Sequence, residues 1–227
     1  MPVVLRSRLA AAALCCLAAL PGGAGSAAEA PGPPPFPKAL AGLALGMSEA
    51  DFRKARPAAK RFEIFDEPEV KDDPNPWYTE PLQGDPFFDL ASYTFGGHRL
   101  CAVALSALSR GEPLHLKQAK ILQGSVQKWG GGYERVWQMS RGRKPKSAPV
   151  KTPALLWKLG SYRILAKFSD ARATDAQGEV NLAIMDLRCL PARVKQGLFN
   201  SLVPANGAAA QAPFKILEAQ VEPPLFE

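Results

Sequence analysis

Alternation of apolar and polar residues predicts a first β-hairpin. Residues 88–95 and 98–106 are strand-like and surround Gly96-Gly97, a pair that suits a two-residue type I′ turn. Counting outward from this turn gives three cross-strand pairs: Tyr93 with Leu100, Leu90 with Val103, and Phe88 with Leu105. The face that we expect in the core carries Phe88, Leu90, Cys101, Val103 and Leu105.

A second hairpin is predicted by residues 154–159 and 162–168, which flank Gly160-Ser161. Glycine at the first turn position is typical of a type II′ turn. The pairing then sets Trp157 opposite Ile164, and Leu155 opposite Ala166. Residues 133–139 and 179–188 predict two further strands.

Helical spacing and capping residues predict three helices. Ser48 is a good N-cap, Asp51 follows at the capping-box position, and Pro57 ends a short helix over 48–56. A second helix opens at Pro113, carries a stripe from Leu114 to Trp129, and ends at Gly130-Gly131-Gly132. Residues 191–202 predict a third, with Val194 and Leu198 inward.

This order of elements predicts an α+β fold, in which helices pack on one face of an antiparallel sheet. Two helix-plus-hairpin units, 38–110 and 111–203, resemble a degenerate αββ repeat within one domain of residues 38–203. A Pro-rich linker over 29–37 precedes it. Residues 204–227 are expected to be a loosely ordered tail, with 214–217 docking on the domain.

The first 28 residues have the pattern of a cleavable export signal. Arg6 and Arg8 precede an uncharged apolar run over 9–20, and small residues lead to Ala28. The run is shorter than the ~20 residues that span a bilayer, so no membrane anchor is expected after cleavage. Cleavage after Ser26 fits as well. The residues before Cys15 and Cys16 fit a lipoprotein motif poorly. We therefore expect a periplasmic or secreted protein.

Cysteine usage and charge agree with export. Only Cys101 and Cys189 follow the signal, and an even number in an oxidising compartment suggests one disulfide. Two separate buried thiols are the alternative. The signal holds two basic and no acidic residues, so the formal net charge of +7 falls to +5 on its removal. This permits attraction to anionic surfaces, but we expect no nucleic-acid partner.

Residues with chemical potential do not form a known catalytic, cofactor or metal motif. His98 and Cys101 are three positions apart on one predicted strand, so they would point to opposite faces. Asp72, Asp73 and Asn75 lack the spacing of a calcium loop. We therefore predict no catalytic residue, no metal and no cofactor.

Two segments are candidates for contact with a partner. Residues 63–89 are rich in proline and acidic residues, are expected to be mostly loop, and contain the adjacent Trp77 and Tyr78. These two aromatics either meet a partner or pin the loop to the core. The basic segment 141–151 contains Arg141, Arg143 and Lys144. Both segments could equally be ordinary solvated loops that attract each other.

The stretch from Gly42 to Phe52, with its Gly46-Met47-Ser48 helix opening, resembles small bacterial envelope domains. The small lipoprotein subunit of the outer-membrane β-barrel assembly machinery is one such domain, and secreted β-lactamase-inhibitor proteins are similar. The resemblance implies an α+β scaffold that binds proteins. We expect a non-enzymatic module whose partner is an envelope protein or an anionic envelope component. The alternative is an envelope hydrolase with dispersed acidic residues.

Overall fold

A computed structural model describes residues 32–62, 75–108, 114–140, 150–168, 179–207 and Phe214. The chain divides between residues 30 and 31 into two units, and every described residue belongs to the second. The predicted signal, Asp72 and Asp73, and the basic residues Arg141, Arg143 and Lys144 lie outside the described residues.

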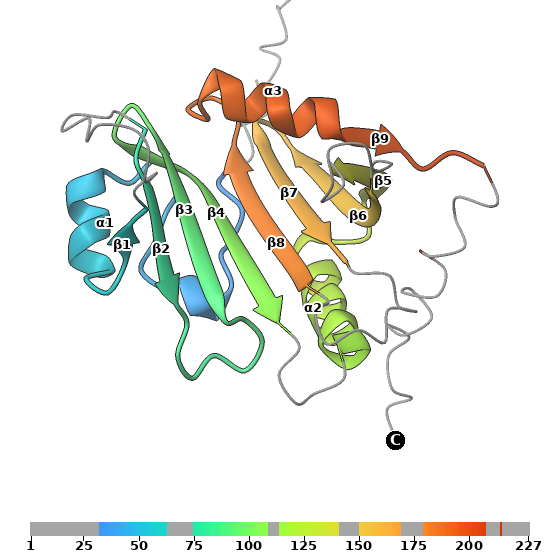
Figure 1. Cartoon of the computed structure of the whole chain (residues 1–227), viewed down its shortest axis with the longest axis horizontal. Coiled ribbons are helices and arrows are strands. Elements are labelled where there is room, and N and C mark those ends of the chain that lie inside the picture. The colour runs from blue at the N-terminus through green and yellow to red at the C-terminus, as the bar shows by residue number, and fades with distance from the viewer. Residues whose placement is uncertain are drawn as a thin grey trace, which may run out of the picture. The chain divides into compact units, whose positions relative to one another are not determined.

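One antiparallel sheet of nine strands forms the framework, in the order β1-β2-β3-β4-β8-β7-β6-β5-β9 (Figure 1). The elements up to β4 are η1 (Lys38–Leu40), α1 (Glu49–Ala55), β1 (Lys60–Arg61), β2 (Trp77–Pro81), β3 (Leu90–Gly96) and β4 (Arg99–Leu108). They are followed by α2 (Leu114–Trp129), β5 (Tyr133–Ser140), β6 (Val150–Leu159), β7 (Tyr162–Lys167), β8 (Glu179–Asp186), α3 (Ala192–Ser201) and β9 (Leu202–Pro204). The broad α+β prediction is confirmed.

The chain thus runs twice through a helix and a four-stranded meander. β4 and β8 are the last strands of the two meanders, and they pair at the centre of the sheet with Ala104 opposite Ala183. The β3–β4 and β6–β7 connections are tight hairpins, in which Gly97 and Gly160 adopt positive φ. The second hairpin has the predicted register, with Trp157 opposite Ile164.

The first hairpin differs from its prediction in turn and register. Its turn is Gly97-His98, both with positive φ, and Tyr93 pairs with Val103 instead of Leu100. The register shifts because Cys101 is an extra residue between the pairs Phe95–Leu100 and Thr94–Ala102, which makes a β-bulge. A count outward from the turn cannot detect a bulge, so the predicted pairs were wrong.

The face of the sheet that packs on α1 and α2 is here called the core face. Phe52 of α1 is fully buried there against the rings of Tyr78, Tyr93 and Phe95. Ser48 caps α1 as predicted, since its Oγ accepts the N–H of Asp51 at 3.2 Å. Ile121 and Leu122 of α2 join the same cluster of buried side chains.

The opposite face of the sheet, here called the second face, carries α3. Val194 and Leu198 pack there against a separate cluster that includes Leu156 and Leu165. The prediction that the helices share one face is therefore wrong for α3. Pro153 to Trp157 are consecutively buried, a pattern typical of a strand that is covered on both faces, and this requires an element on each side.

The segment predicted as loop over 63–89 contains β2. Tyr78 and Glu80 are buried while Trp77 is half-exposed, which is the alternation of a strand with one buried face. The sequence did not predict this strand because prolines flank it and because Glu80, a charged residue, occupies an inward-facing position where an apolar residue is expected. In the predicted tail, Phe214 is fully buried and its ring lies 5.6 Å from that of Trp137, as the docking prediction requires. Residues 215–217 lie outside the described part of the chain.

Candidate functional site

Strand β2 separates the two aromatic residues that the sequence singled out. Tyr78 is 5% exposed on the core face, so the core-pinning interpretation holds for this residue. Its hydroxyl donates a hydrogen bond to Glu49, and burial together with this bond raises the pKa of Tyr78 to about 12. Trp77 lies on the second face and is 48% exposed. Only Trp77 is therefore available to a partner.

Trp77 belongs to a group of residues on the second face that we call the open patch. Its members are Phe62, Trp77, Thr79, Leu90, Ser92 and Thr94. Thr94 is paired with Trp77, and Ser92 with Thr79, so these side chains share one face. Phe62 donates its N–H to the carbonyl of Trp77 at 2.8 Å, which continues the register of β1 and places its ring on that face.

Large apolar side chains stand at the ends of the open patch, and short polar ones lie between them. Phe62 is 52% exposed and Leu90 is 37% exposed. The prediction that Leu90 is buried is wrong, because the bulge at Cys101 sets Leu90 opposite Ser106, whose side chain faces away from α1 and α2. Ser, Thr and Ala side chains on β3 and β4 leave the backbone of the sheet close to the surface. The arrangement suits contact with a protruding apolar group.

In the described part of the chain, α3 is the helix that packs on the second face. Its apolar side chains meet a cluster drawn mainly from β5 to β8, and Figure 1 shows α3 crossing one end of these strands. The second face of β2 and β3 lies outside that cluster. The described helices thus cover both faces of the sheet in its second half and the core face alone in its first half.

Charge on the second face is mainly positive among the strand residues with described side chains. The register places Lys60, Lys158, Arg163 and Lys167 there, with Glu134 as the acidic exception. Glu134 is already paired with Lys158 at 2.6 Å. Carboxylates on an approaching surface would therefore meet a favourable potential.

No family model, curated protein or solved structure matches this chain. Within the described ranges, no helix has the length and apolar character needed to cross a membrane. The same residues contain no group of three or more side chains suited to hold a metal ion. The chemistry of the site therefore has to be argued from its own geometry.

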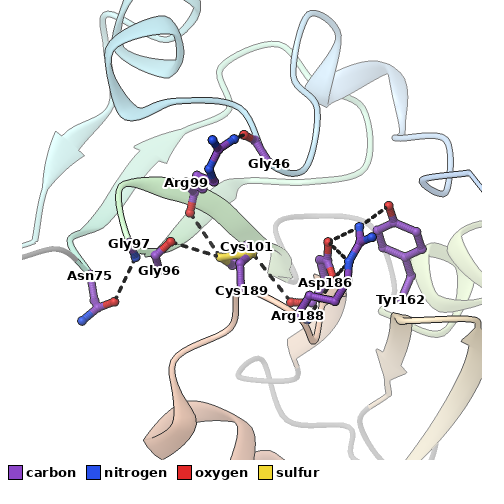
Figure 2. Close-up of a disulfide and its surroundings, with 10 residues drawn as sticks. All are labelled: Gly46, Asn75, Gly96, Gly97, Arg99, Cys101, Tyr162, Asp186, Arg188 and Cys189. Atoms are coloured by element: carbon purple, nitrogen blue, oxygen red, sulfur yellow. Dashed lines mark hydrogen bonds and ion pairs between the residues drawn. A yellow bond between two sulfur atoms is a disulfide. The ribbon is translucent and has the colours of Figure 1, made fainter.

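The disulfide between Cys101 and Cys189 confirms the predicted pairing, with 5.6 Å between the Cα atoms. It joins the bulge of β4 to the turn that follows β8 (Figure 2). The bulge turns Cys101 toward the second face, whereas the prediction placed it on the core face with Val103. The bridge thus ties the first half of the sheet to the turn that leads into α3.

An ion pair beside the disulfide stabilises the same turn. Arg188 donates to Asp186 Oδ2 at 2.7 Å, to Asp186 Oδ1 at 3.0 Å, and to the hydroxyl of Tyr162 at 2.9 Å (Figure 2). Asp186 also accepts the backbone N–H of Arg188. Burial alone would raise the pKa of Asp186, but the bonds to Arg188 lower it. All of these contacts shape the turn, so we assign them a structural role.

Among the described residues, the cluster that most resembles a site for general acid–base catalysis consists of Glu49, Tyr78 and His98. His98 Nδ1 lies 3.1 Å from Glu49 Oε2, and the His98 carbonyl accepts the N–H of Glu49. Burial alone would raise the pKa of Glu49, but hydrogen bonds from Tyr78 and His98 lower it. His98 also has φ 59°, a region that residues other than glycine rarely adopt. The cluster fastens α1 to the first hairpin.

Sequence reasoning also missed a buried ion pair. Arg56 Nη1 donates to Glu80 Oε1 at 3.0 Å, and Arg56 Nη2 donates to the carbonyl of Ala39 at 2.6 Å. Burial and the charge of Glu80 raise the pKa of the neighbouring Tyr93. This pair links η1, α1 and β2 on the core face, away from the open patch. Only the period of two across β2 could have indicated that Glu80 points inward.

Proposed function

We propose that this protein is an exported, non-enzymatic binding module that recognises an acidic partner protein through the open patch. The observation that carries the proposal is the half-exposed Trp77 on the β2–β3 part of the second face, which lies outside the cluster that α3 covers. Tryptophan is enriched among the residues that dominate binding free energy at protein interfaces. Exposed clusters of large apolar groups on a small protein are typical of interaction sites.

The partner is a protein with carboxylates around an apolar protrusion. The apolar group would sit between Trp77 and Leu90, over the short side chains of Thr79 and Ser92. The carboxylates would meet the basic side chains at the borders of the second face, among them Lys60 and Lys167. Arg141, Arg143 and Lys144 would add to this attraction. Exposed charges are screened over ~8 Å at physiological ionic strength, so association should weaken with salt.

The symmetry of the element order supports a scaffold role. We infer that the two runs of a helix and four strands are a degenerate repeat, with the Ala104–Ala183 pair near its centre. Duplication of such a unit yields a broad sheet, and the first half of its second face is available for binding. The resemblance of the Gly46-Met47-Ser48 opening to small bacterial envelope domains points to the same class of function.

Export rests on the pattern of the first 28 residues. Mass spectrometry of the protein purified from its native source should find a new N-terminus between Ala27 and Pro31. An intact Met1, or an acyl chain on Cys16, would contradict cleavage by the export peptidase at this site.

Capture from envelope extracts with site-specific variants tests the binding surface. Trp77→Ala and Leu90→Glu should each reduce capture of the partner at least tenfold, as should joint neutralisation of Arg141, Arg143 and Lys144. Phe199→Ala is the matched control, because Phe199 is an exposed aromatic residue on α3. Equal capture by all folded variants would place the interface elsewhere. Salt-sensitive binding to anionic envelope polymers in place of a protein would also overturn the proposal.

A hydrolase remains the second candidate, and the contact between His98 and Glu49 is the observation that favours it. A carboxylate next to a histidine is a common general-base arrangement. Hydrolysis of an envelope polymer by the purified protein would support this function if Glu49→Gln abolished it and Trp77→Ala preserved it. The binding-module proposal would then be wrong.

A further inference from the structure

A cavity of about 500 Å³ lies on the core face, at the junction of the two halves of the sheet. Its walls come from η1, from the connection between β2 and β3, and from α2, and Leu182 of β8 contributes to its lining. The volume is within the range of ordinary small-molecule sites. This cavity is separate from the open patch, which lies on the opposite face.

The cavity is mainly apolar. Phe88, Ile121 and Leu182 are buried side chains that line it, and the partly buried Trp129 also belongs to the lining. Phe87, also in the lining, is 38% exposed, so a large apolar ring borders the cavity in contact with water. An apolar ligand that covers this surface would remove it from water, which is favourable.

Gly124 keeps the α2 side of the cavity open. It lies in the middle of a 16-residue helix, where glycine is less favourable than alanine. No atom lies within 4 Å of the position that its Cβ would take, so helix packing does not require glycine here. Because Gly124 lines the cavity, any larger side chain would take up space inside it.

Positive charge borders the same cavity. Lys120 and Lys128 flank Gly124 at four-residue spacing along α2, and Lys38 approaches from η1. The acidic residue in the lining is Asp85, whose Oδ1 already accepts the N–H groups of Phe87 and Phe88. Lys128 also donates a hydrogen bond to the carbonyl of Phe36. The lining therefore has three positive charges and one negative charge, which favours an anionic group on the ligand.

We propose that this cavity binds a free aliphatic carboxylate of the fatty-acid class. The chain would lie against Phe88, Ile121 and Leu182, and the carboxylate would face the lysines. Apolar walls with a few converging charges are the usual composition of such a site. The proposal does not depend on the open patch or on its protein partner.

Calorimetric titration of the full chain with sodium dodecanoate, below its micelle concentration, tests the site. Saturable one-to-one binding is expected. Gly124→Leu should weaken it at least tenfold, and Gly197→Leu should not. Gly197 is the matched control because it is also a helical glycine with nothing within 4 Å of its Cβ position, and it does not line the cavity.

Further variants and probes keep the test decisive. Phe87→Glu places a carboxylate at the border of the cavity and should also weaken binding. This variant replaces Gly124→Leu in the test if Gly124→Leu does not fold. Joint replacement of Lys38 and Lys128 by Gln should weaken binding severalfold. Trp77→Ala should bind dodecanoate as the parent does, even if it has lost the protein partner.

Three results would overturn the proposal: no saturable binding, equal affinity for dodecyltrimethylammonium, or binding only to vesicles of anionic phospholipid.

Discussion

A Cβ atom on Gly96 would lie 2.0 Å from the carbonyl oxygen of Cys189. The turn after β8 therefore packs directly on the backbone at the end of β3, beside the disulfide (Figure 2). Gly96 is required for this close approach, whereas Gly97 supplies the positive φ of the hairpin turn. The two adjacent glycines thus have different roles.

Gly96→Ala should lower the free energy of unfolding by about 3 kcal/mol, because a side chain would push the 187–190 turn away from β3. Chemical denaturation followed by tryptophan fluorescence measures the change. Gly131→Ala is the matched control, since nothing lies within 4 Å of its Cβ position and its φ is not positive. Similar stability of the two variants would show that the turn does not pack on Gly96.

Removal of the disulfide should also destabilise the protein. The bridge closes a loop with a sequence separation of 88 residues, for which the chain-entropy model gives about 4.6 kcal/mol. The double variant Cys101→Ala, Cys189→Ala should lose this amount, and addition of reductant should affect the parent but not the variant. If reductant leaves the unfolding curve of the parent unchanged, the bridge does not form in solution.

The neighbours Trp77 and Tyr78 should differ sharply in their effect on stability. Tyr78→Ala removes a buried ring that packs on Phe52 and Phe95, so a loss of about 3–5 kcal/mol is expected. Trp77→Ala alters a half-exposed side chain and should cost less than about 1.5 kcal/mol. Thermal unfolding followed by circular dichroism separates the two. The reverse order would mean that β2 presents its other face to the core.

Stability should fall in acid partly through Asp186. Burial alone would raise the pKa of Asp186 in the folded protein, but Arg188 lowers it. The stabilisation from the ionised carboxylate is therefore present above the unfolded pKa near 3.9, and it is lost as the pH falls through the folded pKa. Between pH 6 and pH 3 the parent should therefore lose about 1 kcal/mol more than Asp186→Asn.

Glu134→Gln, at an exposed ion pair, serves as the control for this acid profile and should follow the parent closely. Free energies of unfolding from urea titrations at several pH values give both profiles. Parallel profiles for the parent and Asp186→Asn would show that Arg188 does not hold this carboxylate ionised in the folded protein.

The sequence by itself determined the elements whose signals are local. Ser48 begins α1, Gly130 ends α2, and Gly160-Ser161 sets the register of the second hairpin, because capping and turn preferences act over a few residues. The pairing of Cys101 with Cys189 was predicted because they are the only two cysteines that follow the export signal. The roles of Phe62 and Leu90 in the open patch could not be read in this way, since neither lies in a local motif.

Tertiary structure alone decided on which side of the sheet Leu90, Cys101 and Trp77 lie. The extra residue Cys101 shifts the first hairpin, and since side chains alternate with a period of two, Leu90 moves from the predicted core to the surface. Trp77 and Tyr78 are adjacent in sequence, yet β2 directs one to the surface and the other to Glu49. The cavity beside Gly124 exists only because η1, α2 and β8, far apart in the chain, meet there.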